Sequence, residues 1–181
     1  MKPILMVIAP KDFRDEELFE TKEELIESGL RTVTASISKG ICTGTKNGKT
    51  IAEVELKNLD TDNYHAVIFV GGPGSRVYFE NPEAHRIAKE MATDQKTVAA
   101  ICIAPIILAK AGLLKDRSAT VHATETETLK KLGAHYTGLA LTQDENIITA
   151  NGPQSARAFG ELISKNITEN KRSLKFNHQA R

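Results

Sequence analysis

The stretch from Thr97 to Leu108 constrains the fold of this chain more than any other. It begins with an unbroken apolar run that ends at Cys102, and Pro105 follows shortly afterwards. Such a run is typical of a parallel strand that is covered on both faces. Proline suits the first turn of a helix because its missing N–H costs nothing there. The stretch therefore predicts a buried strand that turns at once into a helix, with Cys102 on the turn.

This position makes Cys102 a candidate reactive thiol. Open α/β sheets hold their ligands at the carboxyl ends of the strands, and a helix N-terminus favours a thiolate. A free cysteine has a pKa of roughly 8.5, so it needs such help at neutral pH. The other cysteine, Cys42, has no charged or histidine partner near it in the sequence, and we interpret it as structural or incidental.

Strand and helix patterns alternate along the rest of the chain. We predict strands at 3–9, 30–36, 54–56, 65–70, 97–102, 119–122, 134–136, 139–142 and 147–150, and a hairpin around Asn47-Gly48. Helices are predicted at 15–28, 81–94, 105–112, 124–132 and 155–170. The alternation predicts an α/β fold with a mainly parallel sheet. We expect a single domain over 1–170, followed by a polar, basic and frayed tail over 171–181.

Composition excludes several classes of function. The 181 residues carry a net charge of +1 and no tryptophan, which argues against nucleic acid and acidic membranes as partners. The first apolar run is too short for a signal peptide, and no segment approaches a membrane span. Two cysteines without an export signal predict free thiols in a cytoplasmic protein. Neither cysteine has neighbours at zinc-ligand spacing, so no metal site is predicted.

Two other predicted strand ends carry groups that could serve Cys102. One strand runs into Gly71 and Gly72, and another ends at His122. Because carboxyl ends of parallel strands share one edge of a sheet, these groups can converge on the cysteine. The glycines lack the dinucleotide and phosphate-loop patterns, so we interpret them as backbone N–H donors to an oxyanion. The alternative is an ordinary tight turn.

An acidic helix supplies a candidate carboxyl group. Most glutamates of the helix predicted at 15–28 fall on one side, which is the expected solvent face. Glu17 instead lies beside Leu18 and one turn before Thr21, on or near the inward face. It could therefore point toward the protein, or it could be a flank residue that interacts with the helix dipole. Arg14 and Arg76 could line a pocket rim and attract an anionic substrate, or form surface ion pairs.

Taken in order, these pieces resemble the ThiJ/PfpI superfamily. The matching pieces are the glutamate within 15–18, the strand that ends in Val70-Gly71-Gly72, the elbow 99–102 and the histidine at 122. The resemblance covers nearly the whole chain, from Ile4 to about Lys165. It implies a flavodoxin-like sandwich with helices on both faces of the sheet, related to class I glutamine amidotransferases. It also implies a homodimer with the cysteine near the interface.

The resemblance also implies roles for individual residues. Cys102 resembles the nucleophile of the family, and Glu17 resembles the glutamate whose carboxyl group hydrogen-bonds the thiolate. His122 resembles the histidine found near the cysteine in one branch. Either Gly71 or Gly72, together with the backbone N–H of Ile103, resembles the oxyanion hole.

Three differences from the protease-like branch argue against proteolysis. Ile103 occupies the position where that branch has a histidine directly after the cysteine. Ala104 replaces the glycine usual before the proline. The segment 73–76 contains no acid where that branch has a glutamate.

These residues support two main hypotheses. In the first, the chain is a stress-related, cofactor-free enzyme of the glyoxalase or deglycase type, which acts on small reactive carbonyls without a metal. A protonated Glu17 would lower the pKa of the Cys102 thiol, which would attack an aldehyde such as methylglyoxal, and Glu17 or His122 would move the proton. In the second, it is a non-catalytic redox sensor or protective protein that uses Cys102 oxidation. An intracellular cysteine peptidase is a weaker alternative.

Overall fold

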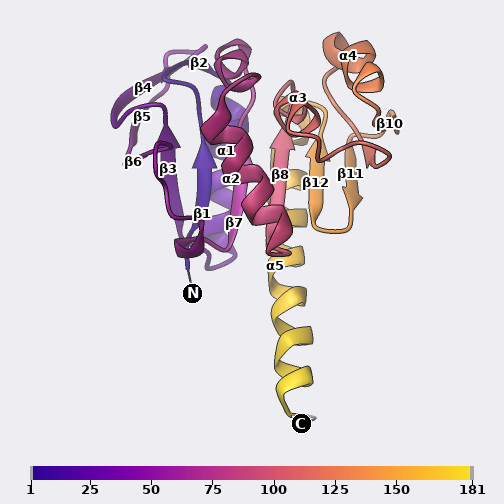
Figure 1. Ribbon diagram of the computed structural model, residues 1–181. Coiled ribbons are helices and arrows are strands. Elements are labelled where there is room, and N and C mark those ends of the chain that lie inside the picture. Colours follow the sequence, from indigo (N-terminus) through magenta and orange to yellow (C-terminus); the bar gives the residue numbers. More distant parts are fainter. Residues whose placement is uncertain (1, 180–181) are drawn as a thin grey trace.

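A seven-stranded sheet forms the centre of the protein, whose structure is a computed structural model describing residues 2–179 (Figure 1). The strand order is β11-β12-β8-β7-β1-β3-β6. All neighbours are parallel except the pair β11 and β12 at one edge. In that order the strands are Leu141–Asp144, Ile147–Ala150, Thr97–Ile101, Ala66–Phe69, Ile4–Val7, Thr32–Ser36 and Val54–Glu55. The mainly parallel α/β sheet expected from the sequence is confirmed.

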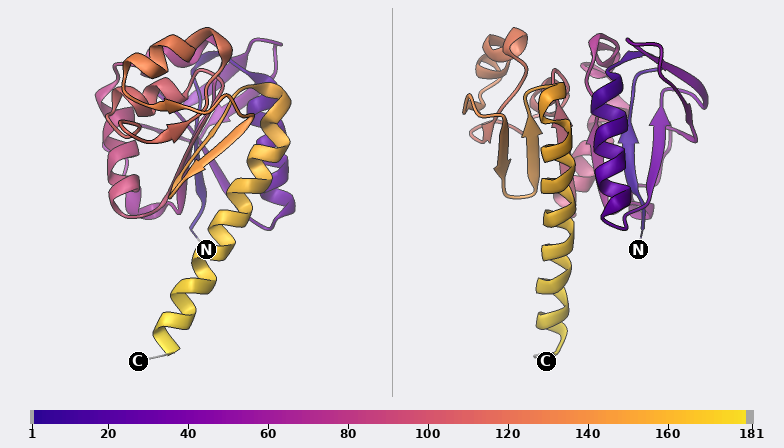
Figure 2. Two further views of the ribbon diagram at one scale, coloured as in Figure 1. Left: turned by 90° about the vertical axis from the view of Figure 1, so that its right-hand side faces the viewer. Right: turned by 180° about the vertical axis from the view of Figure 1, so that it is seen from behind.

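Helices cover both faces of this sheet. On one face, α1 (Asp15–Glu27) and α5 (Ala156–Gln179) lie side by side, as the view from behind shows (Figure 2). The other face packs against α2 (Pro82–Thr93) and α3 (Pro105–Lys110). A short helix, α4 (Thr126–Lys131), follows a 3₁₀ turn, η3 (Ala123–Glu125). Further 3₁₀ turns are η1 (Thr61–Asn63), η2 (Pro73–Tyr78) and η4 (Pro153–Ser155).

The strand sequences explain why the sheet is buried on both faces. Along β1, Leu5 and Val7 pack into the core beneath α2 and α3, while Ile4 and Met6 pack into the core beneath α1 and α5. Successive side chains of a strand point to opposite faces, so a continuous apolar run is what a doubly covered strand requires. All four side chains of this strand are at most 1% exposed.

Two small sheets complete the fold. The hairpin predicted around Asn47-Gly48 is confirmed as β4 (Gly40–Gly44) paired antiparallel with β5 (Lys49–Ala52). It also pairs with β2 (Lys11–Phe13), a short strand in a segment that we expected to be a loop. The second small sheet pairs β9 (Ser118–Ala119) with β10 (His135–Tyr136).

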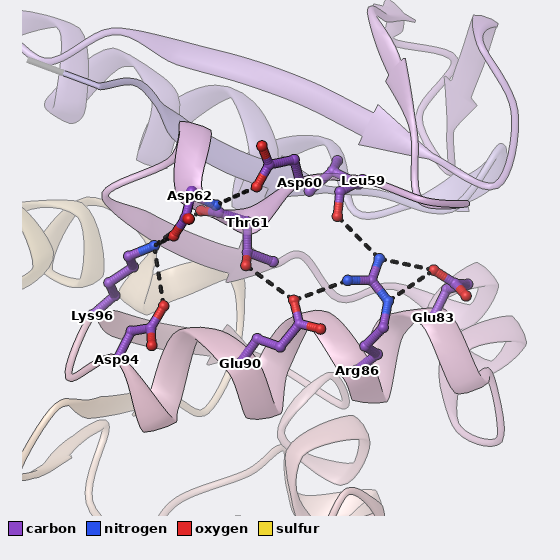
Figure 3. Close-up of polar contacts among 9 residues, drawn as sticks. All are labelled: Leu59, Asp60, Thr61, Asp62, Glu83, Arg86, Glu90, Asp94 and Lys96. Atoms are coloured by element: carbon purple, nitrogen blue, oxygen red, sulfur yellow. Dashed lines mark hydrogen bonds and ion pairs between the residues drawn. The ribbon is translucent and has the colours of Figure 1, made fainter.

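A polar network fastens the connection before β7 onto α2 (Figure 3). The guanidinium of Arg86 donates to the carbonyl of Leu59 (3.1 Å) and also bonds Glu83 and Glu90. The hydroxyl of Thr61 donates to the same Glu90 (3.0 Å). These groups are hydrogen-bonded to one another, so the network holds the segment that precedes β7 in place.

Two predicted elements are wrong in detail. The strand expected over 119–122 is only Ser118–Ala119, and it lies outside the main sheet because β12 already occupies the place beside β8. The helix expected over 124–132 begins instead as η3, which is capped by the ring of His122, and continues as α4. No helix among the described residues is long and apolar enough to cross a bilayer.

The final helix is longer than the sequence indicated. We expected it to end at about Asn170 and the tail after it to fray, but α5 continues to Gln179. The residues 171–179 include no glycine or proline, and lysine, arginine, leucine and glutamine are good helix formers. The last two residues of the predicted tail, 180–181, lie outside the described part of the chain.

Candidate active site

The turn predicted at Cys102 is present and is held in an unusual backbone conformation. Cys102 directly follows β8, and Pro105 begins α3 as expected. The φ angle of Cys102 is +65°, in the left-handed region that non-glycine residues rarely adopt. Its N–H donates to the carbonyl of Ala150 (2.9 Å), and its carbonyl accepts from the N–H of His122 (2.8 Å). Neighbouring segments therefore fix the strained turn from both sides.

Glu17 points inward, as one of the two sequence interpretations proposed. Its side chain is fully buried (0% exposed), and Oε2 accepts a hydrogen bond from the N–H of Gly71 (2.9 Å). Among the described residues, Oε1 has no ordinary hydrogen-bond partner, and the Cys102 thiol is the group that interacts with this carboxyl. Burial raises the pKa of Glu17 to about 7, although contacts with Cys102 and Gly71 oppose the rise.

The thiol itself does not behave as the sequence suggested. Burial, and then the negative charge of an ionised Glu17, raise the pKa of Cys102 to about 12, while backbone N–H groups of Gly72 and Ile103 lower it. The expectation of a lowered thiol pKa is therefore wrong, because the effect of burying the sulfur outweighs that of the backbone N–H groups. When Glu17 is protonated that charge disappears, so Glu17 and Cys102 titrate as one unit.

Three consecutive acids at the start of α1 have three different partners. Asp15 turns toward the hairpin and accepts from the backbone N–H groups of Lys46 (2.8 Å) and Gly48 (2.7 Å). Glu16 pairs with Arg14 and Lys46, and Glu17 faces Cys102. Asp15 is only 7% exposed, and no sequence pattern marks it as a buried group. Its partners lie in a hairpin distant in sequence, so helix periodicity carries no signal for it.

His122 reaches the site from a loop rather than from a strand end of the main sheet. The hydroxyl and the backbone N–H of Thr124 both approach its Nδ1, at 2.9 and 3.4 Å. Because the backbone N–H can only donate, Nδ1 accepts and Nε2 carries the ring hydrogen. The ring is half-buried and lines the same cavity as the cysteine.

The cavity has a volume of about 420 Å³. It is lined by Arg14, Glu17, Gly72, Pro73, Arg76, Cys102, Ile103, His122, Thr124, Pro153 and Gln154. The structure thus brings the predicted cysteine, glutamate and histidine together. Both arginines considered in the sequence also lie on this lining.

The two glycines have separate tasks. The N–H of Gly71 is engaged by Glu17, which leaves the N–H of Gly72 and that of Ile103, both directed at the sulfur, as candidate oxyanion donors. Gly72 has a φ of +96°, and a Cβ there would lie 2.4 Å from the backbone nitrogen of Arg14. Only glycine satisfies both the conformation and the close approach.

The described residues contain no group of three or more histidine, cysteine, aspartate or glutamate side chains that could hold a metal ion. Cys42 is 1% exposed in the core beneath α1 and α5, in agreement with a structural thiol.

Fold and site together define an α/β protein with a cysteine on a strained strand-to-helix turn beside a buried glutamate. The model of the DJ-1/PfpI family matches residues 2–166, and the chain belongs to this family. A crystal structure of a ThiJ/PfpI domain protein from Brachyspira murdochii superposes with a TM-score of 0.91, at 28% identity, over 93% of this chain and 98% of that one.

Three relatives illustrate what the family contains. An uncharacterized protein of Methanocaldococcus jannaschii is 44% identical over 92% of this chain and 83% of its own. A protein of Thermococcus kodakarensis named a deglycase is 31% identical, over 86% of this chain and 93% of its own. A protein of Caenorhabditis elegans named a glutathione-independent glyoxalase is 26% identical, over 92% of this chain and 89% of its own. The chain is thus a member of a family that includes proteins named deglycases and glyoxalases.

Proposed function

We propose that this protein converts small 2-oxoaldehydes, such as methylglyoxal, into 2-hydroxy acids at Cys102 without a cofactor. The observation that carries the proposal is the buried pair of Glu17 and Cys102 at the base of a cavity large enough for a small molecule. A carboxyl with a pKa near 7 can hold a proton and release it at neutral pH, which is what a general acid and base requires.

The reaction would proceed through a thioester. The sulfur of Cys102 attacks the aldehyde carbon, a C–S bond forms, and the carbonyl oxygen takes up a proton. The hydrogen on that carbon leaves as a proton and is returned to the neighbouring carbonyl carbon, so one carbon is oxidised as the other is reduced. Water then cleaves the thioester, which releases the hydroxy acid and restores the thiol. The overall change is the addition of one water to the 2-oxoaldehyde.

Each neighbouring group has a task in this scheme. Glu17, which interacts with the Cys102 thiol, accepts the thiol proton and carries protons between the two carbons. The N–H groups of Gly72 and Ile103 stabilise the oxyanion of each tetrahedral intermediate. His122, with Nε2 as a donor, polarises the second carbonyl or delivers the proton to it. Ile103 leaves Cys102 without an adjacent histidine, and we do not propose a peptidase.

Lactate formation from methylglyoxal by the purified protein tests the proposal. We expect turnover by the wild type, loss of turnover in Cys102→Ala, and retention in Cys42→Ala, the matched control for losing a thiol. A wild type that makes no lactate contradicts the proposal. If mass spectrometry then shows Cys102 gaining two oxygens under mild peroxide, the redox-sensor function takes its place, since a protonated Glu17 would also hydrogen-bond a sulfinate.

We also propose that the protein forms a homodimer. Ile41 and Ile51 pair across the hairpin and are 71% and 63% exposed, which is unusual for large aliphatic side chains. Ile26 on α1 is also exposed (54%). Sedimentation should give a dimer for the wild type and a monomer for Ile41→Lys combined with Ile51→Lys. A monomeric wild type contradicts this proposal.

A further inference from the structure

Two guanidinium groups lie at the cavity that contains Cys102. Of the residues lining it, Arg14 and Arg76 are the permanent cations, and Glu17 is the only carboxylate among them. The carboxylates that hold the two arginines, Glu16 and Glu125, do not line the cavity. The cavity lining therefore carries the positive charge of both arginines, whereas the carboxylates that pair with them are not part of the lining.

Arg14 is held in place by an acid that stays ionised. Its Nε and Nη2 donate to Glu16 at 2.8 and 3.3 Å. Burial opposes ionisation of Glu16, but hydrogen bonds from Lys46 and Arg14 lower its pKa to about 2. The lysine also offsets the charge of Glu16, so the group of Arg14, Glu16 and Lys46 keeps one net positive charge. The arginine side chain is 34% exposed, so it remains accessible from the cavity.

Arg76 is held by an acid and by an aromatic ring. Its Nη2 donates to Glu125 (2.5 Å), whose side chain is 8% exposed, and its guanidinium lies 5.3 Å from the centre of the Phe79 ring. A guanidinium has five N–H donors, and this arrangement uses one of them. Since a fixed arginine loses little side-chain entropy when it binds, it is suited to recognise a carboxylate.

We propose that Arg14 and Arg76 form an anion subsite, so that the preferred substrates are 2-oxoaldehydes that carry a carboxylate on the end remote from the aldehyde. This inference rests on the proposed function for the reaction, but the anion subsite can be tested without turnover. The cavity volume of about 420 Å³ is large enough to hold such a compound.

Arg14 could instead act only on the reacting pair. The hydrogen bond to Glu16 raises the pKa of Arg14, and the negative charges of Glu16, Glu17 and Cys102 contribute to the rise, so this arginine interacts with the pair electrostatically. That role would change the rate for every substrate equally. An anion subsite changes the rate according to the charge of the substrate, and this difference separates the two roles.

The first experiment compares 4,5-dioxopentanoate with its methyl ester, which has the same reacting carbons and no charge. We expect kcat/KM to be at least tenfold higher for the anion in the wild type, mainly through KM. Arg14→Gln and Arg76→Gln should each reduce this preference about tenfold, as loss of one charge-assisted hydrogen bond does. Arg117→Gln removes the same charge from an ion pair with Asp144 and Glu145 away from the cavity lining, and should keep the preference.

The second experiment requires no turnover. Iodoacetate and iodoacetamide both alkylate a thiolate, with loss of iodide, and differ in charge. In a Cys42→Ala background, we expect the ratio of the iodoacetate rate to the iodoacetamide rate to exceed that of N-acetylcysteinamide, an uncharged free thiol, about tenfold. The ratio should fall toward the free-thiol value in Arg14→Gln and Arg76→Gln, and stay unchanged in Arg117→Gln.

The two experiments distinguish the failures. If neither dioxo compound nor methylglyoxal is consumed but the alkylation ratio depends on the arginines, the proposed reaction is wrong and the anion subsite stands. If the ester and the anion react equally well, and the alkylation ratio matches that of N-acetylcysteinamide, the anion subsite is refuted. A preference that survives both arginine substitutions refutes it as well.

Discussion

Glu17 and Gly71 are joined by a hydrogen bond from the glycine N–H to Oε2 (2.9 Å), and this bond is what aims the carboxyl at the cysteine. The chain at Gly71 passes so close that an added Cβ would lie 2.5 Å from Glu17 Oε2 and 2.5 Å from the Cβ of Cys102. The absent side chain of Gly71 thus creates the space in which the acid and the thiol meet.

Gly71→Ala should therefore damage both stability and activity. The new methyl group would also lie 2.7 Å from the backbone oxygen of Ile101, which cannot rotate away. We expect a loss of about 1–3 kcal/mol in the free energy of unfolding, typical of overpacking, together with loss of lactate formation from methylglyoxal. Gly152→Ala is the matched control, because its nearest neighbour would be 3.5 Å away and its backbone is extended. Equal denaturation midpoints for the two variants would contradict the packing argument.

The raised pKa of Glu17 makes stability depend on pH. An acid with a folded pKa of about 7 and an ordinary value of 4.5 binds more protons in the folded state between these pH values, so stability falls as pH rises through this window. Above pH 7 the cost amounts to roughly 3 kcal/mol. Glu17→Gln removes the charge and can still accept from Gly71. It should therefore raise Tm by several degrees at pH 8 and very little at pH 4.5.

Calorimetry of both proteins at the two pH values measures this effect. Glu27→Gln, which makes the same change of charge on an exposed part of α1, should show no comparable dependence. A gain from Glu17→Gln that is equal at both pH values would show that its carboxyl is not protonated in the folded state.

The sequence identified the principal site residues because their signals are local. The apolar run and Pro105 locate Cys102 on a strand-to-helix turn, and helix periodicity gives Glu17 an inward position. Both signals depend on residues within a few positions of the one concerned. Gly71 and Gly72 follow a strand in the same local manner, although their division of tasks depends on Glu17, which comes from a different element.

The features that sequence patterns missed depend on tertiary contacts. His122 was expected at the end of a strand in the main sheet, but β12 fills that place, and the histidine instead reaches the cavity through the bond of its N–H to the Cys102 carbonyl. The direction of the thiol pKa also depends on burial and on the charge of Glu17, neither of which is encoded near Cys102. Local patterns therefore located the candidate site residues but not their environment.

Asp15 should be a strong determinant of stability although it takes no part in the proposed chemistry. Its carboxylate accepts from two backbone N–H groups and from the hydroxyl of Thr45 (3.3 Å), and it holds the hairpin turn against α1. Asp15→Ala leaves these donors without an acceptor, and we expect a loss of about 2–4 kcal/mol. Asp62→Ala, which removes a surface carboxylate 3.4 Å from Lys96, should cost less than about 1 kcal/mol.

Denaturant titration measures the free energies of unfolding of the two variants, and hydrogen exchange shows which part of the protein loses protection. The amides of Lys46 and Gly48 should lose protection in Asp15→Ala, whereas those of β8 should change only with global stability. Unchanged protection at both amides would mean that the carboxylate is dispensable for the turn.

The backbone of Cys102 provides the last prediction. At a φ of +65°, a residue with a Cβ is strained by about 1–2 kcal/mol, and glycine is not. Glycine gains flexibility in the unfolded chain, which offsets about 0.4–1 kcal/mol of this relief. Cys102→Gly should therefore be more stable than Cys102→Ala by about 0.5–1 kcal/mol, measured by denaturant unfolding. Cys42 does not have a positive φ, so the same two substitutions there should have the opposite order of stability. At that position glycine relieves no strain and only makes the unfolded chain more flexible. If alanine is the more stable replacement at both cysteines, the turn at Cys102 stores no backbone strain. The hydrogen bonds to Ala150 and His122 would then not be needed to hold a strained conformation.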